Sequence, residues 1–413
     1  VPGVPGVMHF CHNEHVAWGM TYGSADTQDL FIERFRESDG KREYAFKDEW
    51  KAAEVYQEQL EVRGSEPVAL EVTVTHHGPV IAGDPSTGEA VSISDPGLLE
   101  GTPWVDSVRD AMRSTSVAEL HKAFANWTDR VNNYAVADVE GNFGYIHEGK
   151  IPIRGEANGW RAVPGYGGEY EWRGYIRQEE LPRAINPDVG YAVTCNQRVA
   201  EHDYPYYVGI HFTPEFRGRR VQSRILQLSE GAATVDDMGA IHAERLSLPA
   251  RLLVSQLGEA DSDNERAKQA LTYLRSWDCR MDREDVAPSI YAETRSQLVI
   301  LIARHLFKED TDTLLSGVAG ADDHLRFVAL ALHMAIEKND VSLLPDGTTW
   351  QEAIISSLEK ACNALEEILG PEVSEWFWGR LHRTRPIHPL SSVFPDVAEY
   401  LNPPSYGVHG DGD

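Results

Sequence analysis

Residues 132–149, "NNYAVADVEGNFGYIHEG", decide the fold class. Two runs that alternate apolar and polar side chains, residues 133–138 and 143–147, flank the short segment Glu140, Gly141 and Asn142. A glycine between polar residues at this spacing is typical of a tight turn between antiparallel strands. The stretch therefore predicts a β-hairpin in the first half of the chain.

Other short strands are expected around this hairpin. Residues 15–21 and 30–35 are apolar or alternating runs, and residues 191–195 resemble a buried strand. Residues 68–74 place an apolar side chain at every second position before "HHGPV", which predicts a half-buried strand that ends in a turn. The first half of the chain is thus expected to be rich in β-sheet.

Helices are expected between and after these strands. Ser116 and Glu119 have the spacing of a capping box, and the apolar residues after them share one helical face: Val117, Leu120, Phe124 and Trp127. From about Val221 onward, helical spacing dominates, in residues 220–228, 265–277, 289–307 and 350–369. Strands first and helices later, without strict alternation, favour an α+β fold.

Composition limits the possible partners. With 65 acidic and 38 basic residues, the formal net charge is −27, which argues against binding to a phosphate backbone. No run of about 18 apolar residues predicts a membrane span. Val1 and the terminal "GVHGDGD" have the appearance of cut ends, so we expect this chain to be part of a longer or processed polypeptide.

Histidine pairs suggest a metal site, but their spacing does not favour one. His12 and His15 lie in a segment with strand character, and no HExxH motif accompanies them. His76 and His77 are adjacent, so in a strand they would point to opposite faces and could not share an ion. The four cysteines are scattered and form no CxxC pair. Structural histidines are therefore the expectation.

Two other functions are open at this point. No GxSxG elbow supports a serine hydrolase of the α/β type. Carboxylates such as Glu33 and Asp138 could serve a glycosidase, although any acidic chain supplies such pairs. The many Trp and Tyr residues could line a sugar groove, so a non-catalytic carbohydrate-binding or structural β protein is the alternative to an enzyme.

Several segments, taken in order, resemble one family. They are "PGVMHFCHNEHVAWGMTYGSADTQDLFIER", "VTHHGPVI", the hairpin above with "KIPIR" after it, "VPG...EWRGYI", "LPRAINPDVGYAVTCNQR", "DYPYY", "RGRRVQSRI" and "WGRLH". Together they resemble the penicillin acylase (penicillin amidase) family of N-terminal-nucleophile hydrolases. The resemblance implies a four-layer αββα sandwich of antiparallel sheets. It divides this chain into a β core (1–220), a helical section (221–370) and a return to the core (371–413).

The resemblance also implies a mechanism. In this family, a precursor is cleaved into α and β chains, and the new amino-terminal serine attacks a linear amide with its own α-amine as base. An α-amine with a pKa near 8 is partly neutral at physiological pH, which suits that role. The serine would lie upstream of Val1, so we expect this chain alone to be inactive.

The residues that surround the nucleophile can be carried over by motif. The oxyanion asparagine of the family falls at Asn196 in "VTCNQR", and the second donor, a backbone N–H, falls at Tyr22 in "WGMTYG". Arg220 matches an arginine near that asparagine. The matching acyl-pocket positions are Phe10, Met20, Tyr22 and Asn132. Asn132 would make this pocket more polar than one that suits a phenylacetyl group.

Calcium-binding members carry two aspartates after the oxyanion-donor strand, and these fall at Asp26 and Asp29. Oxygen ligands from a loop suit a structural Ca²⁺ ion. Where those members have a further acidic ligand, this chain has Tyr207 and Val208. The expected partners are a small-molecule amide, such as a β-lactam or N-acyl-homoserine lactone, and the α chain of the same precursor. By the family's habit, the protein would be periplasmic or secreted.

Overall fold

The computed structural model describes residues 9–101, 103–128, 130–201, 203–228, 233–316 and 322–411. It divides into two compact units, Val1–Thr213 and Pro214–Asp413. Every strand found in the described part of the chain lies in the first unit, and the long helices lie in the second. The predicted α+β class and its order of strands before helices are confirmed.

One sheet of the first unit has five strands in the order β1-β2-β10-β11-β13. The predicted hairpin is present: β10 (Asn132–Asp138) pairs antiparallel with β11 (Phe143–Glu148). Asp138 fixes the turn because its Oδ1 accepts from the backbone N–H of Asn142 at 2.9 Å. The other strands are β1 (Phe10–His12), β2 (Val16–Tyr22) and β13 (Arg183–Ile185).

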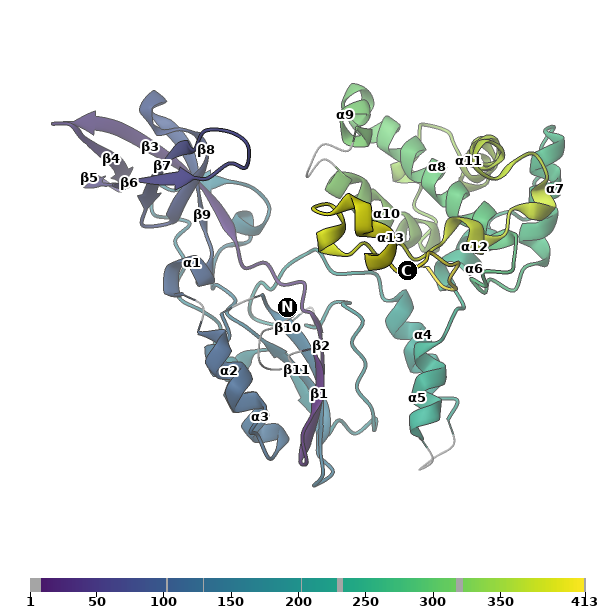
Figure 1. Cartoon of the computed structure of the whole chain (residues 1–413), viewed down its shortest axis with the longest axis horizontal. Helices are drawn as coiled ribbons and strands as arrows, with labels where there is room; N and C mark the ends of the chain where they lie inside the picture. Colours follow the sequence, from purple (N-terminus) through teal and green to yellow (C-terminus); the bar gives the residue numbers. More distant parts are fainter. Residues whose placement is uncertain are drawn as a thin grey trace. The chain divides into compact units, whose positions relative to one another are not determined.

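Helices α2 (Trp104–Ala111) and α3 (Val117–Ala123) cover one face of this sheet (Figure 1). The predicted helical face is confirmed, since Val117, Leu120, Phe124 and Trp127 are all buried. They form one core with side chains from alternate positions of the strands, including Trp18, Tyr134 and Ile146. The buried apolar face of α3 therefore determines which face of the sheet is apolar.

The capping box at the start of α3 differs from the prediction. Ser116 Oγ accepts from the Glu119 N–H at 3.2 Å, as expected of an N-cap residue. The Glu119 carboxylate instead accepts from the backbone N–H and the hydroxyl of Thr115, each at 2.8 Å. In a capping box, the Glu119 carboxylate would accept from the backbone N–H of Ser116. Here it accepts one residue earlier, from Thr115, which offers two donors.

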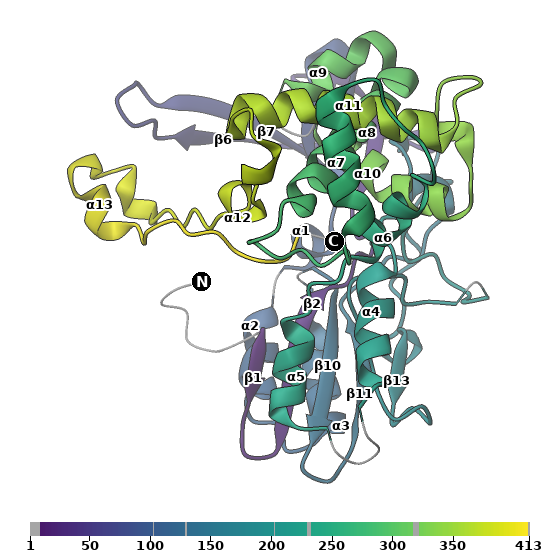
Figure 2. The same ribbon diagram turned by 90° about the vertical axis from the view of Figure 1, so that its right-hand side faces the viewer.

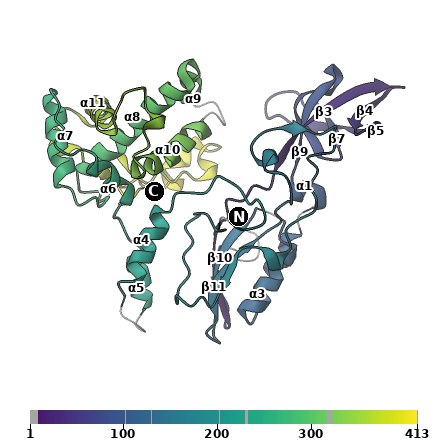
Figure 3. The ribbon, with the colours of Figure 1, turned by 180° about the vertical axis from the view of Figure 1, so that it is seen from behind.

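The second sheet has eight strands in the order β5-β4-β3-β9-β8-β7-β6, with β12 parallel to β3. Figure 3 labels β3, β4, β5, β7 and β9 of this sheet. The other pairs are antiparallel. Its strands are β3 (Asp29–Ser38), β4 (Lys41–Phe46), β5 (Glu49–Ala52), β6 (Glu54–Leu60), β7 (Val68–Thr75), β8 (Gly78–Asp84), β9 (Glu89–Ser94) and β12 (Val163–Pro164). Helix α1 (Pro96–Glu100) follows β9.

Strand β7 exists as predicted, but it buries the other face. Val68 and Leu70 are exposed, whereas Thr73 and Thr75 are buried. The threonine hydroxyls have charged partners inside: Thr75 donates to Glu33 Oε1 at 2.9 Å, and Thr73 accepts from Arg42 at 2.8 Å. Val72 and Val74 of the predicted apolar face are only partly buried, because a polar network occupies the inner face.

The second unit is a helical bundle around one apolar core (Figure 2). The predicted helices are present as α4 (Phe216–Ile225), α7 (Glu265–Ser276), α8 (Ala287–Phe307) and α11 (Trp350–Leu369). The others include α5 (Val235–His242), α6 (Leu248–Ser255), α9 (Thr311–Leu315), α10 (Asp322–Glu337), α12 (Trp378–Leu381) and α13 (Ala398–Leu401). No helix of the described residues combines the length and apolar character that crossing a membrane requires.

Residues 371–413 also belong to this helical unit rather than to the β-rich one. Trp376 is fully buried in the helical core, and the Trp378 N–H donates to the Asp285 carbonyl at 2.8 Å. The Gly410 N–H reaches the Met281 carbonyl at the same distance. The contacts described for this segment thus lie within the helical unit.

Candidate active site

Asn196 lies in a loop with an unusual backbone conformation. Residues 191–195 were expected to form a strand, but they are irregular: the Cys195 N–H donates to the side chain of Gln197 instead of to a neighbouring strand. Asn196 has a φ of 65°, in the left-handed region that asparagine tolerates better than most residues. The Thr213 N–H fixes the loop by donating to the Asn196 carbonyl at 3.0 Å.

The side chain of Asn196 reaches the end of β2. Its Nδ2 lies 2.6 Å from the carbonyl oxygen of Tyr22 and 2.7 Å from Thr21 Oγ1. Two residues that are 174 positions apart in the chain are thus in direct contact. Sequence motifs alone assigned both Asn196 and Tyr22 to one site, and the structure places their polar groups side by side.

A third residue, Asn133 of β10, belongs to the same group and was not identified from the sequence. Asn133 is paired with Thr21 across the strands, so both side chains lie on the face opposite α2 and α3. Asn133 is fully buried, and its Nδ2 donates to the Tyr22 carbonyl at 3.1 Å. That carbonyl therefore receives two amide donors.

Neighbouring groups fix the orientation of the Asn133 amide. Its Oδ1 accepts from the Tyr145 hydroxyl at 2.6 Å and contacts His147 Nδ1 at 2.7 Å. Burial lowers the pKa of His147 to about 3, so the ring is neutral at physiological pH and its proton on Nδ1 faces an acceptor. The amide oxygen is thereby held toward Tyr145 and His147, and the amide nitrogen toward Tyr22.

The predicted acyl-pocket residues divide between the two faces of this sheet. Met20 packs against the core under the helices, and Asn132, paired with Tyr22, donates to the Arg130 carbonyl at 2.8 Å. Phe10 is paired with Gly19, the residue before Met20 in β2. Since successive residues of a strand face opposite sides, the Phe10 side chain lies on the face opposite Met20, where it is 73% exposed. The described residues thus do not bring these four side chains to one face.

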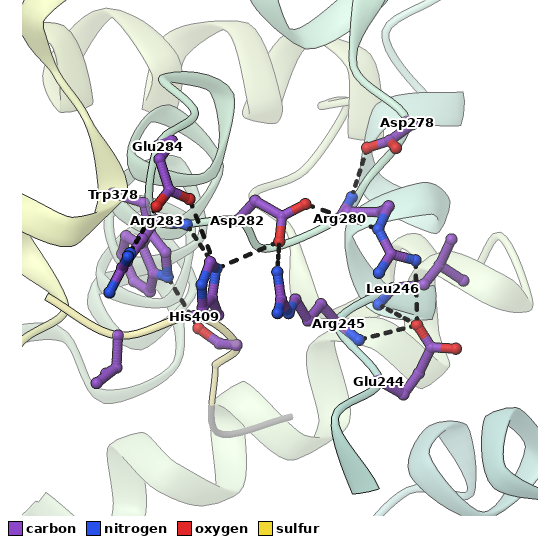
Figure 4. Close-up of polar contacts among 12 residues, drawn as sticks. Glu244, Arg245, Leu246, Asp278, Arg280, Asp282, Arg283, Glu284, Trp378 and His409 are labelled. Carbon is purple, nitrogen blue, oxygen red and sulfur yellow. Dashed lines mark hydrogen bonds and ion pairs between the residues drawn. The ribbon is translucent and has the colours of Figure 1, made fainter. Parts of the chain in front are cut away.

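Arg220 lies on α4, in the helical unit, where it forms an ion pair with Glu244 at 2.6 Å. Burial alone would raise the pKa of Glu244, but the N–H groups of Leu246 and Arg245 and the charge of Arg220 lower it to about 2. Figure 4 shows Glu244 beside Arg280 and Leu246 in a chain of polar contacts. The described partner of Arg220 is therefore a carboxylate of its own unit.

Asp26 and Asp29 converge on one arginine. The guanidinium of Arg154 donates to the Asp26 carbonyl at 2.8 Å, and its Nε lies 3.1 Å from Asp29 Oδ2. The side chains of Arg154 and Asp29 are both 0% exposed, and Trp172 also donates to Asp29. Burial raises the pKa of Asp29, which the charge of Arg154 opposes only in part.

These contacts do not fit the predicted calcium ion. A Ca²⁺ ion takes six to eight oxygen ligands, and the Asp29 carboxylate here faces a guanidinium and an indole N–H. The Asp26 carboxylate accepts from the Tyr207 hydroxyl at 2.5 Å, at the position where a further acidic ligand would be needed. The buried guanidinium of Arg154 thus lies beside a carboxylate that the resemblance assigned to a calcium ion.

His76 and His77 also differ from the prediction. Strand β7 ends at Thr75, so the two residues lie in the turn before β8 and do not alternate between faces. Their ring centroids are only 3.8 Å apart, and both rings contact Glu171. Alternation between the faces of a strand therefore does not separate this pair.

Comparison with known proteins agrees with the order of these motifs. The model of one family, described as Penicillin amidase, matches residues 1–413. The chain belongs to the penicillin amidase family. Penicillin acylase 2 proenzyme from Pseudomonas sp. (strain SE83) is 35% identical over 415 residues, which cover 100% of this chain and 52% of that protein.

Other members of the penicillin amidase family are similar at lower identity. Acyl-homoserine lactone acylase QuiP of Pseudomonas fluorescens (strain Pf0-1) is 27% identical, covering 93% of this chain and 49% of its own length. A thermostable penicillin G acylase from Alcaligenes faecalis has a similar fold, with a TM-score of 0.69 and 22% identity over 91% of this chain and 72% of that one. This chain thus spans about half the length of the curated relatives it matches.

Proposed function

We propose that this chain is part of an acylase that cleaves a linear amide to a carboxylate and an amine. Membership of the penicillin amidase family supports an amidohydrolase over the carbohydrate-binding alternative. The nucleophile would be an amino-terminal serine from sequence that precedes this chain in a longer precursor. The relative named as a proenzyme, twice as long as this chain, is consistent with such a precursor.

The observation that carries the proposal is the contact between Asn196 and the end of β2. An oxyanion hole requires donors that are already in position when negative charge develops on the carbonyl oxygen. Here the Asn196 amide and the backbone of Tyr22 are in contact, and the strained φ of Asn196 is fixed by the loop around it. Strain of this kind is often found at functional sites.

The contacts also indicate how Asn196 could turn toward a substrate. Both of its Nδ2 hydrogens have acceptors, the Tyr22 carbonyl and the Thr21 hydroxyl. If one of them moves to an oxyanion, the Tyr22 carbonyl keeps its bond from Asn133, and the Thr21 hydroxyl can rotate. The exchange therefore leaves no buried carbonyl without a donor.

In the proposed reaction, the serine hydroxyl loses its proton to the serine's own α-amine and attacks the amide carbon. The negative charge then on the carbonyl oxygen is stabilised by Asn196 Nδ2 and the Tyr22 N–H. The C–N bond breaks as the α-ammonium returns the proton to the leaving amine. Water hydrolyses the resulting acyl ester by the same steps.

The proposed substrates are N-acyl compounds with a compact amine part. Similar proteins are named penicillin acylase and acyl-homoserine lactone acylase, which suggests a β-lactam or a homoserine lactone as that part. The exposed Phe10 offers an apolar surface for the acyl chain. In the complete protein, we expect the five-stranded sheet to be one layer of a four-layer αββα sandwich, in a periplasmic or secreted enzyme.

Replacing Asn196 with Ala in the full-length enzyme tests the proposal. We expect turnover to fall about a hundredfold or more with KM nearly unchanged, because the bond to Asn196 strengthens only when charge develops. Steady-state kinetics on an N-acyl-homoserine lactone and on a penicillin would measure this, with folding checked by circular dichroism.

Tyr22→Phe is the matched control. The donor at this position is the backbone N–H, so removal of the hydroxyl should leave turnover near the wild-type value. Near-wild-type turnover of the Asn196→Ala enzyme would exclude Asn196 from the oxyanion hole and would remove the main support for the proposed site.

A further inference from the structure

A second cluster of functional side chains lies at the end of β7, apart from the proposed hydrolytic site. It consists of His76 and His77 in the turn between β7 and β8, and of Glu171 in the loop after β12. Neither the family motifs nor the proposed mechanism gives these three residues a role. All three belong to the first unit of the chain.

The three side chains present their ligand atoms to a common point. His77 Nε2 lies 2.7 Å from Glu171 Oε1, and His76 Nε2 lies 3.4 Å from Glu171 Oε2. One ligand atom from each residue can be chosen so that all lie within 4.8 Å of one another. Ligands bound tetrahedrally to Zn²⁺ at about 2.0–2.2 Å are about 3.4 Å apart, so small side-chain movements would suffice.

A second carboxylate fixes the His77 ring from behind. His77 Nδ1 lies 2.7 Å from Oε1 of Glu33, a fully buried residue of β3. The same oxygen accepts from Thr75 at 2.9 Å and from Ser92 at 2.8 Å. Histidines that bind metal commonly donate their other N–H to a carboxylate, which sets the tautomer and leaves Nε2 free for the ion.

The surrounding groups hold both rings in place. The ring of Phe31 is stacked on His77 with centroids 3.8 Å apart and an interplanar angle of 3°. Tyr44 stacks on His76, and Phe46 packs against its edge. A positioned pair of imidazoles would lose little side-chain entropy on binding an ion.

Charge favours a dication at this point. With His77 protonated on both ring nitrogens, as its contacts with the carboxylates of Glu33 and Glu171 allow, the cluster has a net charge of −1. A divalent ion with neutral imidazoles brings it to zero, and Glu33 has a buried oxygen, Oε2, that no hydrogen bond satisfies among the described contacts. Uncompensated charge in a buried position is costly.

We propose that His76, His77 and Glu171 bind one divalent transition-metal ion, with Zn²⁺ as the expected occupant. Two imidazoles and one carboxylate are the donor set that Zn²⁺ accepts, whereas Ca²⁺ and Mg²⁺ prefer oxygen alone. The ion replaces the proton on His77 Nε2, which is released to solvent. His76 and Glu171 are partly exposed, so the ion has access and its remaining coordination position can hold water.

The test uses the full-length protein, first treated with a chelator and dialysed. Titration with ZnCl₂ in calorimetry should show one site and the release of about one proton, obtained from buffers of different ionisation enthalpy. Excess Zn²⁺ should raise Tm by a few degrees, because the ion binds the folded chain. Co²⁺ in place of Zn²⁺ should give visible absorption bands of a bound ion.

His76→Ala and Glu171→Gln should each weaken Zn²⁺ binding about tenfold to a hundredfold or more. The control is the double variant His12→Ala/His15→Ala, which removes two exposed histidines and should bind Zn²⁺ as the wild type does. Since His77 is buried and its replacement could unfold the protein, His76→Ala is the deciding variant. Absence of a Zn²⁺ heat and of a Tm shift in the wild type, or wild-type affinity in His76→Ala, would overturn the proposal.

Discussion

Asn132 and Asn133 are chemically identical neighbours on β10, yet they face opposite sides of the sheet. The family motif led to Asn132, whose amide contacts the Arg130 carbonyl, whereas Asn133 contacts Tyr22 and the buried pair of Tyr145 and His147. Motifs identified Asn196 and Tyr22 because each follows a recognisable segment. Asn133 could not be found in that way, since its role depends on strand register, which is set by contacts far away in the sequence.

At the position expected to hold calcium, Arg154 provides the first residue-scale prediction. Arg154→Ala in the full-length protein would leave the Asp29 carboxylate buried without its cation, which typically costs about 3–5 kcal/mol. We therefore expect a large fall in the free energy of unfolding, measured by urea denaturation. Arg177→Ala is a matched control, because that arginine forms an exposed ion pair with Glu180.

The same site predicts the response to calcium. If Arg154 is the resident cation, millimolar Ca²⁺ should leave the Tm of the wild-type protein unchanged relative to Mg²⁺. A Tm that rises with Ca²⁺ alone, and that no longer does so in Asp26→Asn, would show that Asp26 and Asp29 bind the metal after all.

At the scale of elements, periodicity predicted where the strands are better than which face they bury. Strand β7 was expected to bury its valines, but Glu33, Arg42 and the threonines form a polar network beneath it. The turn after β7 was predicted, but His76 and His77 were treated as strand residues. Their side chains lie close together because the strand already ends at Thr75. An alternating pattern carries no information on what lies under the sheet.

Helix α3 gives a prediction at this scale. Ser116→Ala removes the acceptor for the Glu119 N–H at the first turn, and loss of an N-cap hydroxyl typically costs about 1 kcal/mol. The apolar face of this helix packs on the sheet that carries Asn133. If the first turn frays, amide hydrogen exchange in residues 117–123 should also increase. Chemical denaturation and exchange measured by mass spectrometry would report the two effects.

Thr115→Val separates the contribution of the Ser116 N-cap from that of the hydrogen bonds between Thr115 and the Glu119 carboxylate. It removes one hydroxyl bond to Glu119 but keeps the backbone N–H bond, at an exposed position. We expect a loss of no more than about 0.5 kcal/mol. A loss equal to that of Ser116→Ala would mean that Thr115, rather than Ser116, holds the start of the helix.

At the scale of the whole molecule, each unit buries a neutral histidine. His147 lies in the β-rich unit and His333 on α10 in the helical unit, and burial lowers the pKa of each to about 3. Composition shows 16 histidines but not which of them are buried. Only the three-dimensional packing separates these two from exposed histidines such as His12 and His15.

The lowered pKa of His147 predicts acid sensitivity. An unfolded histidine binds a proton near pH 6.5, and folded His147 does so only near pH 3, so the unfolded chain holds more protons between these values. Stability is therefore full above pH 6.5 and falls as the pH decreases toward 3, by about 1.4 kcal/mol per pH unit for one such group.

His147→Asn keeps an amide donor toward Asn133 but cannot titrate. The variant should lose less Tm than the wild type between pH 7 and pH 5, whatever its Tm at pH 7, because only the difference in slope reports the proton. Parallel slopes would show that His147 is protonated in the folded protein, which would also remove the neutral ring that orients Asn133.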